Sequence, residues 1–399
     1  MKNRFGMFVH WGIYSLLGTH EQVLSRFDLD YVEYESLAAR FNPTEYDPNE
    51  WVRLAKSAGM EYICFTTKHH DGFCLWDTKT TDYNIMNTPY GRDVLAMLAD
   101  ACREEGMRLS LYYSLPDWHR EDAYNELASR QHQWKSKSHE RADKEAYVAF
   151  VKEQITELLT GYGEIYTLFW DIPPCYEDKS VNELVRRLQP NILINDRGYD
   201  SGDFSTPERR VPSGERFASM TEACQSVGEQ SWGYRADEDY FSARFLSSSI
   251  DKIMAMGGSY LLNVGPMPNG RIPADAEALV RRVGDWYNRV GESLTDTDAP
   301  REKPCLLGCD PYIATEKQGA TYLHFYNGLR SSAITFADGE RMPCHAILLN
   351  SGEELPIRIA PLPMKLDSDS IARKKYCSIT KIPVDGYAAE PLVVKLLWE

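Results

Sequence analysis

Residues 61–73, EYICFTTKHHDGF, combine an apolar, β-rich run with a polar cluster at its end. The run over 61–67 predicts a buried strand. Similar runs recur on both sides of it, at residues 5–10, 108–114, 164–171, 192–196, 218–224 and 259–264, and an eighth is expected near 207–212. Helical patterns separate them. This alternation is typical of a parallel sheet covered by helices.

The helices between these strands carry clear end signals. Asp47 precedes Pro48 and Asn49, which predicts a capped helix start with proline in the first turn. Later helices show apolar stripes, at Tyr147, Val151, Ile155 and Leu158 and at Leu279, Val283, Trp286 and Val290. Seven or eight such units in about 290 residues favour a (β/α)8-like TIM barrel, and no glycine-rich turn supports a dinucleotide-binding sheet.

The rhythm changes after residue 297. Short alternating runs follow, separated by turn signals such as Asn327-Gly328 and Ser351-Gly352. We therefore expect a catalytic barrel over residues 1–297 and a C-terminal antiparallel β-sandwich over 298–399. The polar segment 119–143 is too long for a simple strand-to-helix loop and is expected over the barrel mouth.

Composition excludes several classes of partner. The 399 residues carry 44 basic and 59 acidic side chains, a formal charge of −15. Such a surface repels nucleic acid and anionic membranes, and no long apolar span or secretion signal is visible. Nine cysteines without a CxxC pair indicate free thiols and a cytoplasmic location, although a chain trimmed of its leader would look the same. The sequence leaves a homo-oligomer open.

Polar residues gather where the predicted strands end, which is the reactive face of such barrels. Aromatic, histidine, arginine and carboxylate side chains without a phosphate loop indicate a sugar site. Glycosidic cleavage needs two carboxyl groups, one ionised and one able to donate a proton. Asp171 fits the first role, and Glu208 or Glu222 fits the second.

Each of these residues also has a structural interpretation. Asp171 could cap a helix, the tryptophans could be core, and Arg197 could serve in a structural ion pair. His69 and His70 could be a core residue and its surface neighbour. A metal pair is disfavoured because adjacent strand residues point to opposite faces, so no metal or other cofactor is expected. The coincidence at five strand ends favours a functional site.

The motifs RFGMFVHWGIYS, KHHDGF, LFWD, INDRG, DFSTPE, QSWGY and LLNVGP resemble those of α-L-fucosidases of glycoside hydrolase family 29, over about residues 4–295. The resemblance implies a (β/α)8-like barrel, a C-terminal β-sandwich, and metal-independent hydrolysis of terminal α-linked L-fucose from oligosaccharides or glycoconjugates with retention. It implies that Asp171 is the nucleophile.

The resemblance also implies a set of substrate-binding residues, namely His10, Glu21, His69, His70, Tyr113, Trp170, Arg197 and Trp232. Tyr112 takes the role of Tyr113 if the Tyr112-Tyr113-Ser114 motif aligns with the family one residue earlier. The acid/base occupies different motif positions among family members, which leaves Glu208 and Glu222 open, with Glu208 preferred.

Two departures from the family pattern are visible. The order Phe169-Trp170-Asp171-Ile172 differs from the usual tryptophan two residues before the nucleophile and glycine directly after it, and Thr221 stands where tryptophan usually precedes the glutamate. Two alternatives to a fucosidase stay open. One is a fucose-binding protein with a decayed catalytic pair, and the other is a glycosidase for another deoxy or galacto-configured sugar.

Overall fold

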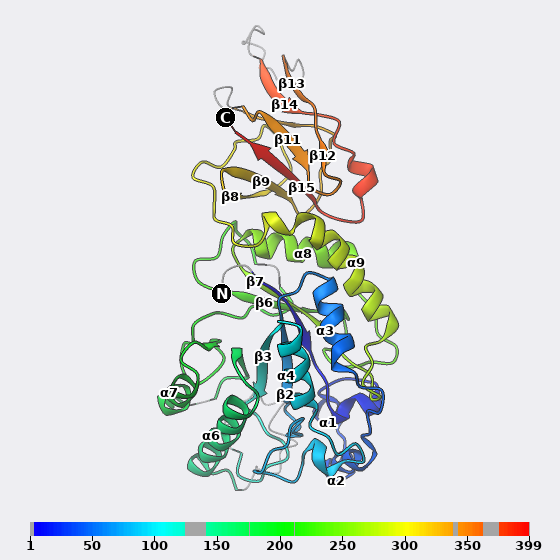
Figure 1. Ribbon diagram of the computed structural model, residues 1–399, viewed down its shortest axis with the longest axis vertical. Helices are drawn as coiled ribbons and strands as arrows, with labels where there is room; N and C mark the ends of the chain where they lie inside the picture. Colours follow the sequence, from blue (N-terminus) through cyan, green and yellow to red (C-terminus); the bar gives the residue numbers. More distant parts are fainter. Residues whose placement is uncertain are drawn as a thin grey trace.

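A computed structural model describes residues 4–123, 141–174, 176–210, 212–337, 342–361 and 375–398. The molecule is elongated, with a parallel sheet wrapped by helices at one end and antiparallel strands at the other (Figure 1). Helices α8 (Ala243–Ala255) and α9 (Ala274–Val290) lie between the two parts. Most of the polar segment expected over the barrel mouth, residues 124–140, falls outside the described residues.

The seven predicted strands form one parallel sheet, which confirms the barrel-like fold. They are β1 (Phe5–Val9), β2 (Tyr62–Lys68), β3 (Arg108–Ser114), β4 (Ile165–Asp171), β5 (Leu193–Ile194), β6 (Glu222–Ser226) and β7 (Ser259–Val264). Their order is β5-β4-β3-β2-β1-β7-β6. All the carboxyl ends therefore lie at one end of the barrel, where the strand-terminal polar residues meet.

The edge strands β5 and β6 of this sheet are not paired with each other, and the space between them in the barrel wall holds no regular strand among the residues that the structure describes. Residues 204–208 lie there and form single parallel bridges, from Phe204 to Asn195, from Ser205 to Thr221 and from Glu208 to Cys224. The prediction of an eighth strand near 207–212 is therefore wrong for the described residues of that range, which form no regular strand. Pro207 breaks the ladder because it has no N–H to donate.

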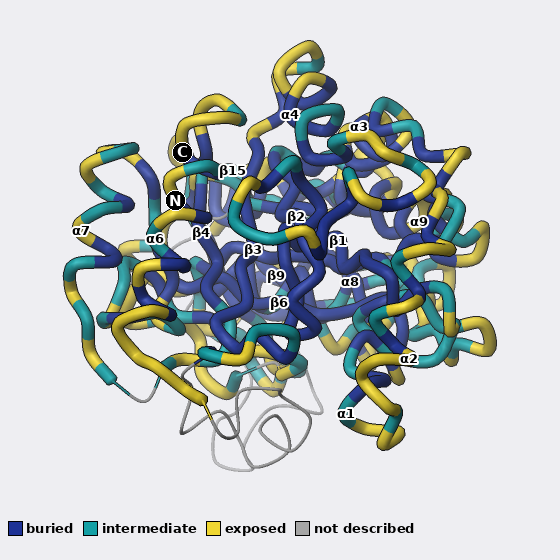
Figure 2. Tube along the Cα trace, turned by 90° about the horizontal axis from the view of Figure 1, so that it is seen from below, coloured by how far each residue is buried: buried dark blue, intermediate teal, exposed yellow. Residues whose placement is uncertain are grey.

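Helices cover the outside of the sheet. The barrel part contains α1 (Val23–Arg26), α2 (Tyr31–Glu35), α3 (Pro48–Ser57), α4 (Val94–Glu104), α6 (Lys144–Gly161), α7 (Lys179–Leu188), α8 and α9, with 3₁₀ helices η1 (Ile13–Leu17), η2 (Ser36–Arg40), η3 (Ile85–Asn87) and η5 (Gly291–Ser293). The 3₁₀ helix η7 (Val384–Tyr387) belongs to the C-terminal part. The Asp47 side chain accepts from the Asn49 N–H at the start of α3, as predicted. Buried strands run through the centre, and exposed residues lie around them (Figure 2).

The C-terminal part contains two antiparallel sheets. One has the order β12-β11-β15-β9-β8 and the other β10-β14-β13. Their strands are β8 (Ile313–Lys317), β9 (Ala320–Phe325), β10 (Ile334–Thr335), β11 (His345–Leu348), β12 (Glu353–Glu354), β13 (Ile357–Ala360), β14 (Tyr376–Ile379) and β15 (Leu392–Leu397). Side chains from both sheets share one apolar core, which confirms the predicted sandwich.

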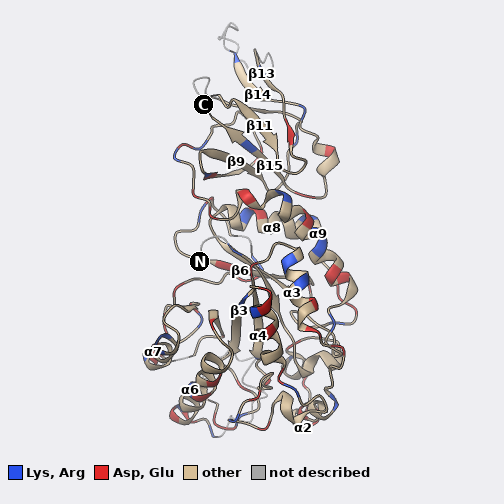
Figure 3. Cartoon of the chain, in the orientation of Figure 1, with Lys and Arg blue, Asp and Glu red and all other residues tan. Residues whose placement is uncertain are grey.

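Buried polar contacts join the two parts. Asp251 of α8 lies with its Oδ1 2.7 Å from Nδ1 of His324 on β9, and both side chains are fully buried. The Trp286 indole of α9 donates to the Pro391 carbonyl at 3.2 Å. Charged side chains lie mainly on helices and loops (Figure 3). In the described part of the chain, no helix is both long enough and apolar enough to span a bilayer.

Candidate active site

The alternation of side chains along β4 decides which residues face the barrel interior. Phe169 packs in the interior apolar cluster, and Asp171, two residues on, shares its face. Trp170 points the other way, because its indole donates to Asn182 Oδ1 of α7 at 3.0 Å. The structure thus corrects the prediction that Trp170 lines the pocket, and Phe169 takes the inward position.

The same alternation separates the two tyrosines of β3. The Tyr113 hydroxyl donates to Gln154 Oε1 of α6 at 2.7 Å, and the Lys68 ammonium lies 4.3 Å from its ring centre, among the outer helices. The Tyr112 hydroxyl instead donates to Asp171 Oδ2 at 2.7 Å. The site therefore contains Tyr112, the alternative residue, and the prediction of Tyr113 is corrected.

Asp171 lies at the carboxyl end of β4 among hydrogen-bond donors. Besides Tyr112, the Arg197 Nη1 donates to Oδ1 at 3.0 Å, whereas His70 Nε2 lies 3.7 Å from Oδ2, beyond hydrogen-bond distance. Burial alone would raise the pKa of Asp171, but attraction to Arg197 and the Tyr112 hydrogen bond outweigh it and lower that pKa below its usual value. The carboxylate is therefore ionised at neutral pH.

Glu208 reaches the same arginine from the segment that fills the barrel gap. Arg197 Nη1 donates to Glu208 Oε2 at 2.9 Å, and the Glu208 side chain is 40% exposed. Because one nitrogen contacts an oxygen of each carboxylate, those oxygens are at most about 6 Å apart. This limit is compatible with the carboxyl separation of about 5 to 5.5 Å in retaining glycosidases.

Glu222 lies at the opposite end of the barrel. It is the first residue of β6, paired with Ser259 at the start of β7, and its Oε2 accepts from the Tyr62 hydroxyl at 2.6 Å. Burial raises the pKa of Glu222 to about 7. Since Tyr62 begins β2 whereas Asp171 ends β4, the structure corrects the prediction that Glu222 faces Asp171.

Aromatic and apolar side chains form the floor beneath the carboxylates. The interior cluster consists of Phe8, Tyr62, Cys64, Tyr112, Phe169, Cys224 and Leu261, with Tyr166 and Trp232 packed against it. The His10 ring lies 5.3 Å from the Trp232 ring and 4.4 Å from the Phe8 ring. The predicted residues His10 and Trp232 therefore form one wall above this floor.

Asn263 of β7 fixes the state of His10. The amide of Asn263 donates to the Ser226 hydroxyl and to the Trp232 carbonyl, so its Oδ1 faces His10 Nδ1 at 2.6 Å as an acceptor. Nδ1 is therefore the donor. Burial lowers the pKa of His10 to about 4, which keeps the ring neutral and gives Nε2 a lone pair.

The two histidines that follow β2 both enter the site. The His69 ring stacks at 5.8 Å on Tyr112 and lies 5.9 Å from His10, and burial followed by repulsion from His70 lowers the pKa of His69 well below its usual value. His70 contacts Ser114 Oγ at 2.6 Å through Nδ1. Since the Ser114 hydroxyl donates to the Pro116 carbonyl, the His70 Nδ1 is the donor.

Glu21 supports this wall from behind. Its Oε2 accepts from the Ser231 hydroxyl at 2.8 Å and from the Trp232 N–H at 2.9 Å. Burial alone would raise the pKa of Glu21, but attraction to neighbouring imidazoles, that of His20 first, and the Ser231 hydrogen bond lower it. The ionised Glu21 thus anchors the loop that carries Trp232.

The backbone directly after Asp171 is unusual. Ile172 has φ 57°, a left-handed conformation that is rare for a β-branched residue. The Asp171 carbonyl meanwhile accepts from the Leu115 N–H at 3.1 Å. The departure from glycine at position 172 therefore places a strained residue beside the carboxylate.

The structure thus gathers most of the predicted residues at one end of the barrel: His10, Glu21, His69, His70, Asp171, Arg197, Glu208 and Trp232. Sequence reasoning missed Asn263, although it stands in the LLNVGP motif, and Arg209, whose guanidinium lies 4.5 Å from the Trp232 ring centre. Within the described ranges, no three His, Cys, Asp or Glu side chains are grouped as metal ligands.

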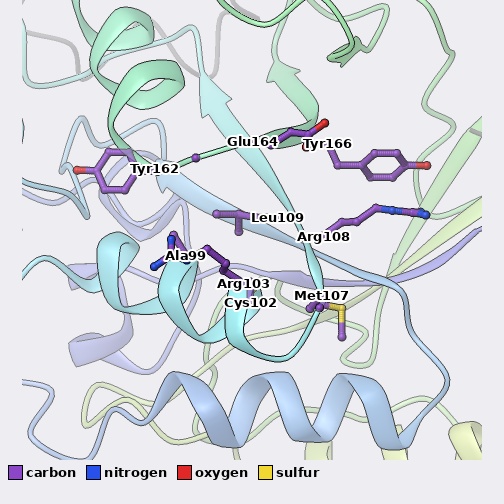
Figure 4. Close-up of a pocket in the computed structure, with 11 residues that line it drawn as sticks. Ala99, Cys102, Arg103, Met107, Arg108, Leu109, Tyr162, Glu164 and Tyr166 are labelled. Carbon is purple, nitrogen blue, oxygen red and sulfur yellow. The ribbon is translucent and has the colours of Figure 1, made fainter.

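A separate cavity of about 470 Å³ lies far from these residues (Figure 4). It is bounded by the end of α4, the start of β3 and the segment leading into β4, with Tyr162 and Tyr166 on its walls. These are amino-terminal strand ends, which in such barrels serve stability rather than catalysis. The cavity is therefore not part of the candidate site.

Known proteins resemble this chain over most of its length. A family model described as Alpha-L-fucosidase matches residues 1–292. The tissue alpha-L-fucosidase of Bos taurus is 27% identical over 326 residues, covering 73% of this chain and 67% of that protein.

Solved structures agree with this match. Alpha-L-fucosidase isoenzyme 1 from Paenibacillus thiaminolyticus has a TM-score of 0.84 and 32% identity, covering 100% of this chain and 97% of that one. A trapped covalent intermediate of a GH29 alpha-L-fucosidase from Bacteroides thetaiotaomicron, in complex with 2-fluoro-fucosyl fluoride, has a TM-score of 0.77 and 26% identity, covering 99% and 94%. The chain belongs to the alpha-L-fucosidase family of glycoside hydrolases.

Proposed function

We propose that this protein removes terminal α-linked L-fucose from oligosaccharides or glycoconjugates by double displacement, with Asp171 as nucleophile and Glu208 as acid/base. The observation that carries the proposal is that both carboxylates bind one nitrogen of Arg197. The upper limit of about 6 Å between their two bound oxygens is compatible with a retaining mechanism. A trapped covalent intermediate in a protein of similar fold is consistent with it.

The two carboxyl groups differ in their surroundings. Asp171 is mostly buried and holds its charge through Arg197 and Tyr112, so it is an aimed, ionised nucleophile. Glu208 is more exposed and lies on an irregular segment, where a leaving group and then water can reach it. This difference assigns attack to Asp171 and proton transfer to Glu208.

The proposed reaction has two steps. In the first, an Asp171 oxygen bonds to the anomeric carbon while the glycosidic bond breaks, and the departing oxygen takes the proton from Glu208. In the second, Glu208 removes a proton from water, whose oxygen bonds to the anomeric carbon as the Asp171 ester bond breaks. Arg197 loses part of its pairing with Asp171 when the ester forms, and Glu208 remains its partner.

Recognition divides between polar and apolar walls. The neutral His10 offers Nε2 as an acceptor for a sugar hydroxyl, since Nδ1 is committed to Asn263. The interior ring of Phe169 and the neighbouring Trp232 suit the C6 methyl group of fucose. Such an apolar contact discriminates by only about 1 to 3 kcal/mol, so the hydroxyl contacts must supply the rest of the selectivity.

Azide rescue tests the nucleophile. We expect Asp171→Gly to abolish release of 4-nitrophenol from its α-L-fucoside, and azide to restore release by occupying the vacated space and forming β-fucosyl azide. If azide restores nothing in this variant but does so in a variant of another carboxylate, Asp171 is not the nucleophile.

A matched pair of variants tests the acid/base. Glu208→Gln should greatly lower kcat/KM for a fucoside with a poor leaving group, whereas Glu222→Gln should leave it nearly unchanged. The reverse order of these two effects would move the role to Glu222. A protein that binds fucose yet releases no phenol in its native form would be a binding protein instead.

A further inference from the structure

Arg209 directly follows Glu208 and turns the chain sharply at that point. It has φ 48°, in the left-handed region, and its N–H donates to the Cys224 carbonyl of β6 at 3.0 Å. Glu208 itself is bridged to Cys224 in parallel. The backbone on both sides of the Glu208 side chain is thereby fastened to the barrel wall.

The Arg209 side chain reaches away from this turn to the loop after β6. Its Nη1 donates to the Glu229 carbonyl at 2.8 Å and lies 3.5 Å from that of Gly228. Its guanidinium carbon lies 4.5 Å from the ring centre of Trp232, the geometry of a cation–π contact. One side chain therefore connects the segment of Glu208 with the loop of Trp232.

From this geometry we propose that Arg209 is a positioning residue that sets Glu208 and Trp232 in their relative places. The inference rests on the proposed function, in which Glu208 moves the proton and Trp232 forms the pocket wall. Arg209 touches no reacting atom in this assignment and acts through those two residues.

Glu208 needs such support more than Asp171 does. Asp171 ends a regular strand and receives hydrogen bonds from two side chains, Tyr112 and Arg197. Glu208 lies on a segment held by isolated bridges, with its side chain 40% exposed. Small misplacements of a catalytic group cost large factors in rate, so a fixed turn directly after Glu208 matters for proton transfer.

Trp232 receives support from the same guanidinium. Its N–H is held by Glu21 and its carbonyl by Asn263, and both contacts fix the main chain. The indole lies 5.3 Å from the His10 ring, and the Arg209 guanidinium carbon lies 4.5 Å from the indole ring centre. Loss of the guanidinium therefore removes one of the contacts that hold the Trp232 indole.

The test compares Arg209→Gly and Arg209→Lys with the native enzyme on two α-L-fucosides, one with a highly acidic phenol and one with an alkyl alcohol. Glycine adopts φ 48° without strain, so Arg209→Gly removes the side chain while permitting the turn. Lysine keeps the charge but not the planar fork. Arg210→Gly, at the exposed neighbouring position, is the matched control.

The measured quantity is kcat/KM, which reports the glycosylation step in which the acid assists the leaving group. We expect Arg209→Gly to lower it on the order of tenfold or more for the alkyl fucoside, but by less than about threefold for the activated phenol. Arg209→Lys should recover part of the loss, and Arg210→Gly should show none. A side chain of general structural use would lower both substrates equally.

The outcomes separate this inference from the proposed function. Glu208→Gln, measured alongside, calibrates the leaving-group effect. If Glu208→Gln shows the effect and Arg209→Gly does not, or if Arg209→Gly lowers both substrates equally, the positioning role is wrong and the acid/base assignment stands. If Glu208→Gln itself shows no leaving-group dependence, the proposed function is wrong at that residue.

Discussion

The strained backbone at Ile172 leads to a prediction about stability. A left-handed conformation costs an L-residue about 1–2 kcal/mol, whereas glycine adopts it freely. Ile172 has φ 57° immediately after Asp171. Ile172→Ala and Ile172→Gly both remove the half-buried side chain, but only the glycine variant relieves the strain. The pair therefore isolates the backbone contribution.

The expected difference follows from two opposing effects. Relief of strain favours the glycine variant by about 1–2 kcal/mol, and the greater freedom of glycine in the unfolded chain costs about 0.5–1 kcal/mol. We expect Ile172→Gly to be more stable than Ile172→Ala by about 0.5–1 kcal/mol. The sign should reverse at Arg282, an exposed position within α9, where glycine costs about 1 kcal/mol relative to alanine.

Urea unfolding followed by tryptophan fluorescence measures both pairs. The two variants at each position should differ in midpoint and share the same slope, since the surface exposed on unfolding is unchanged. The Ile172→Gly enzyme should also keep its activity, because glycine adopts the native backbone angle. If the Ile172→Ala protein is as stable as the Ile172→Gly protein, the backbone after Asp171 is not left-handed and stores no strain.

Two further predictions concern titration. Burial raises the pKa of Glu222 in the folded protein to about 7, whereas the unfolded chain releases the same proton from about pH 4.5 upward. Between these two pH values, the stability of the native protein should therefore fall by about 3 kcal/mol relative to that of Glu222→Gln, as measured by urea titrations across pH. Parallel curves for the two proteins would refute this. Tyr112→Phe removes a hydrogen-bond donor to the Asp171 carboxylate, so the pKa of Asp171 should rise and the acid limb of kcat/KM should move to higher pH, whereas Tyr113→Phe should leave the limb in place. Equal shifts in both variants would contradict the site geometry.

Most of the barrel could be predicted from the sequence because strand runs, caps and apolar stripes are local signals. The Asp47 cap of α3 is an example, since its hydrogen bond depends only on residues two apart. The eighth strand could not be placed, because residues 204–208 are held by contacts with β5 and β6 that are distant in sequence. Proline in that segment weakens any strand pattern.

The site was harder to predict because buried parallel strands are apolar on both faces. The pairs Phe169-Trp170 and Tyr112-Tyr113 give no alternation that shows which ring faces the interior. Glu222 was misplaced for a related reason: β6 begins at this residue, so it lies at the start of its strand rather than at the reactive end. Position along the barrel axis depends on sheet register, which the sequence does not show.

The proposed mechanism requires that Asp171 form a covalent bond with the sugar. Incubation with 2-fluoro-fucosyl fluoride, followed by proteolysis and mass spectrometry, tests it directly because the fluorine slows hydrolysis of the ester. We predict one added 2-fluorofucosyl group, located on Asp171 of the FWD sequence, and none in Asp171→Gly. An adduct on another carboxylate, or turnover of fucosides with inversion and no adduct at all, would exclude Asp171 as the nucleophile.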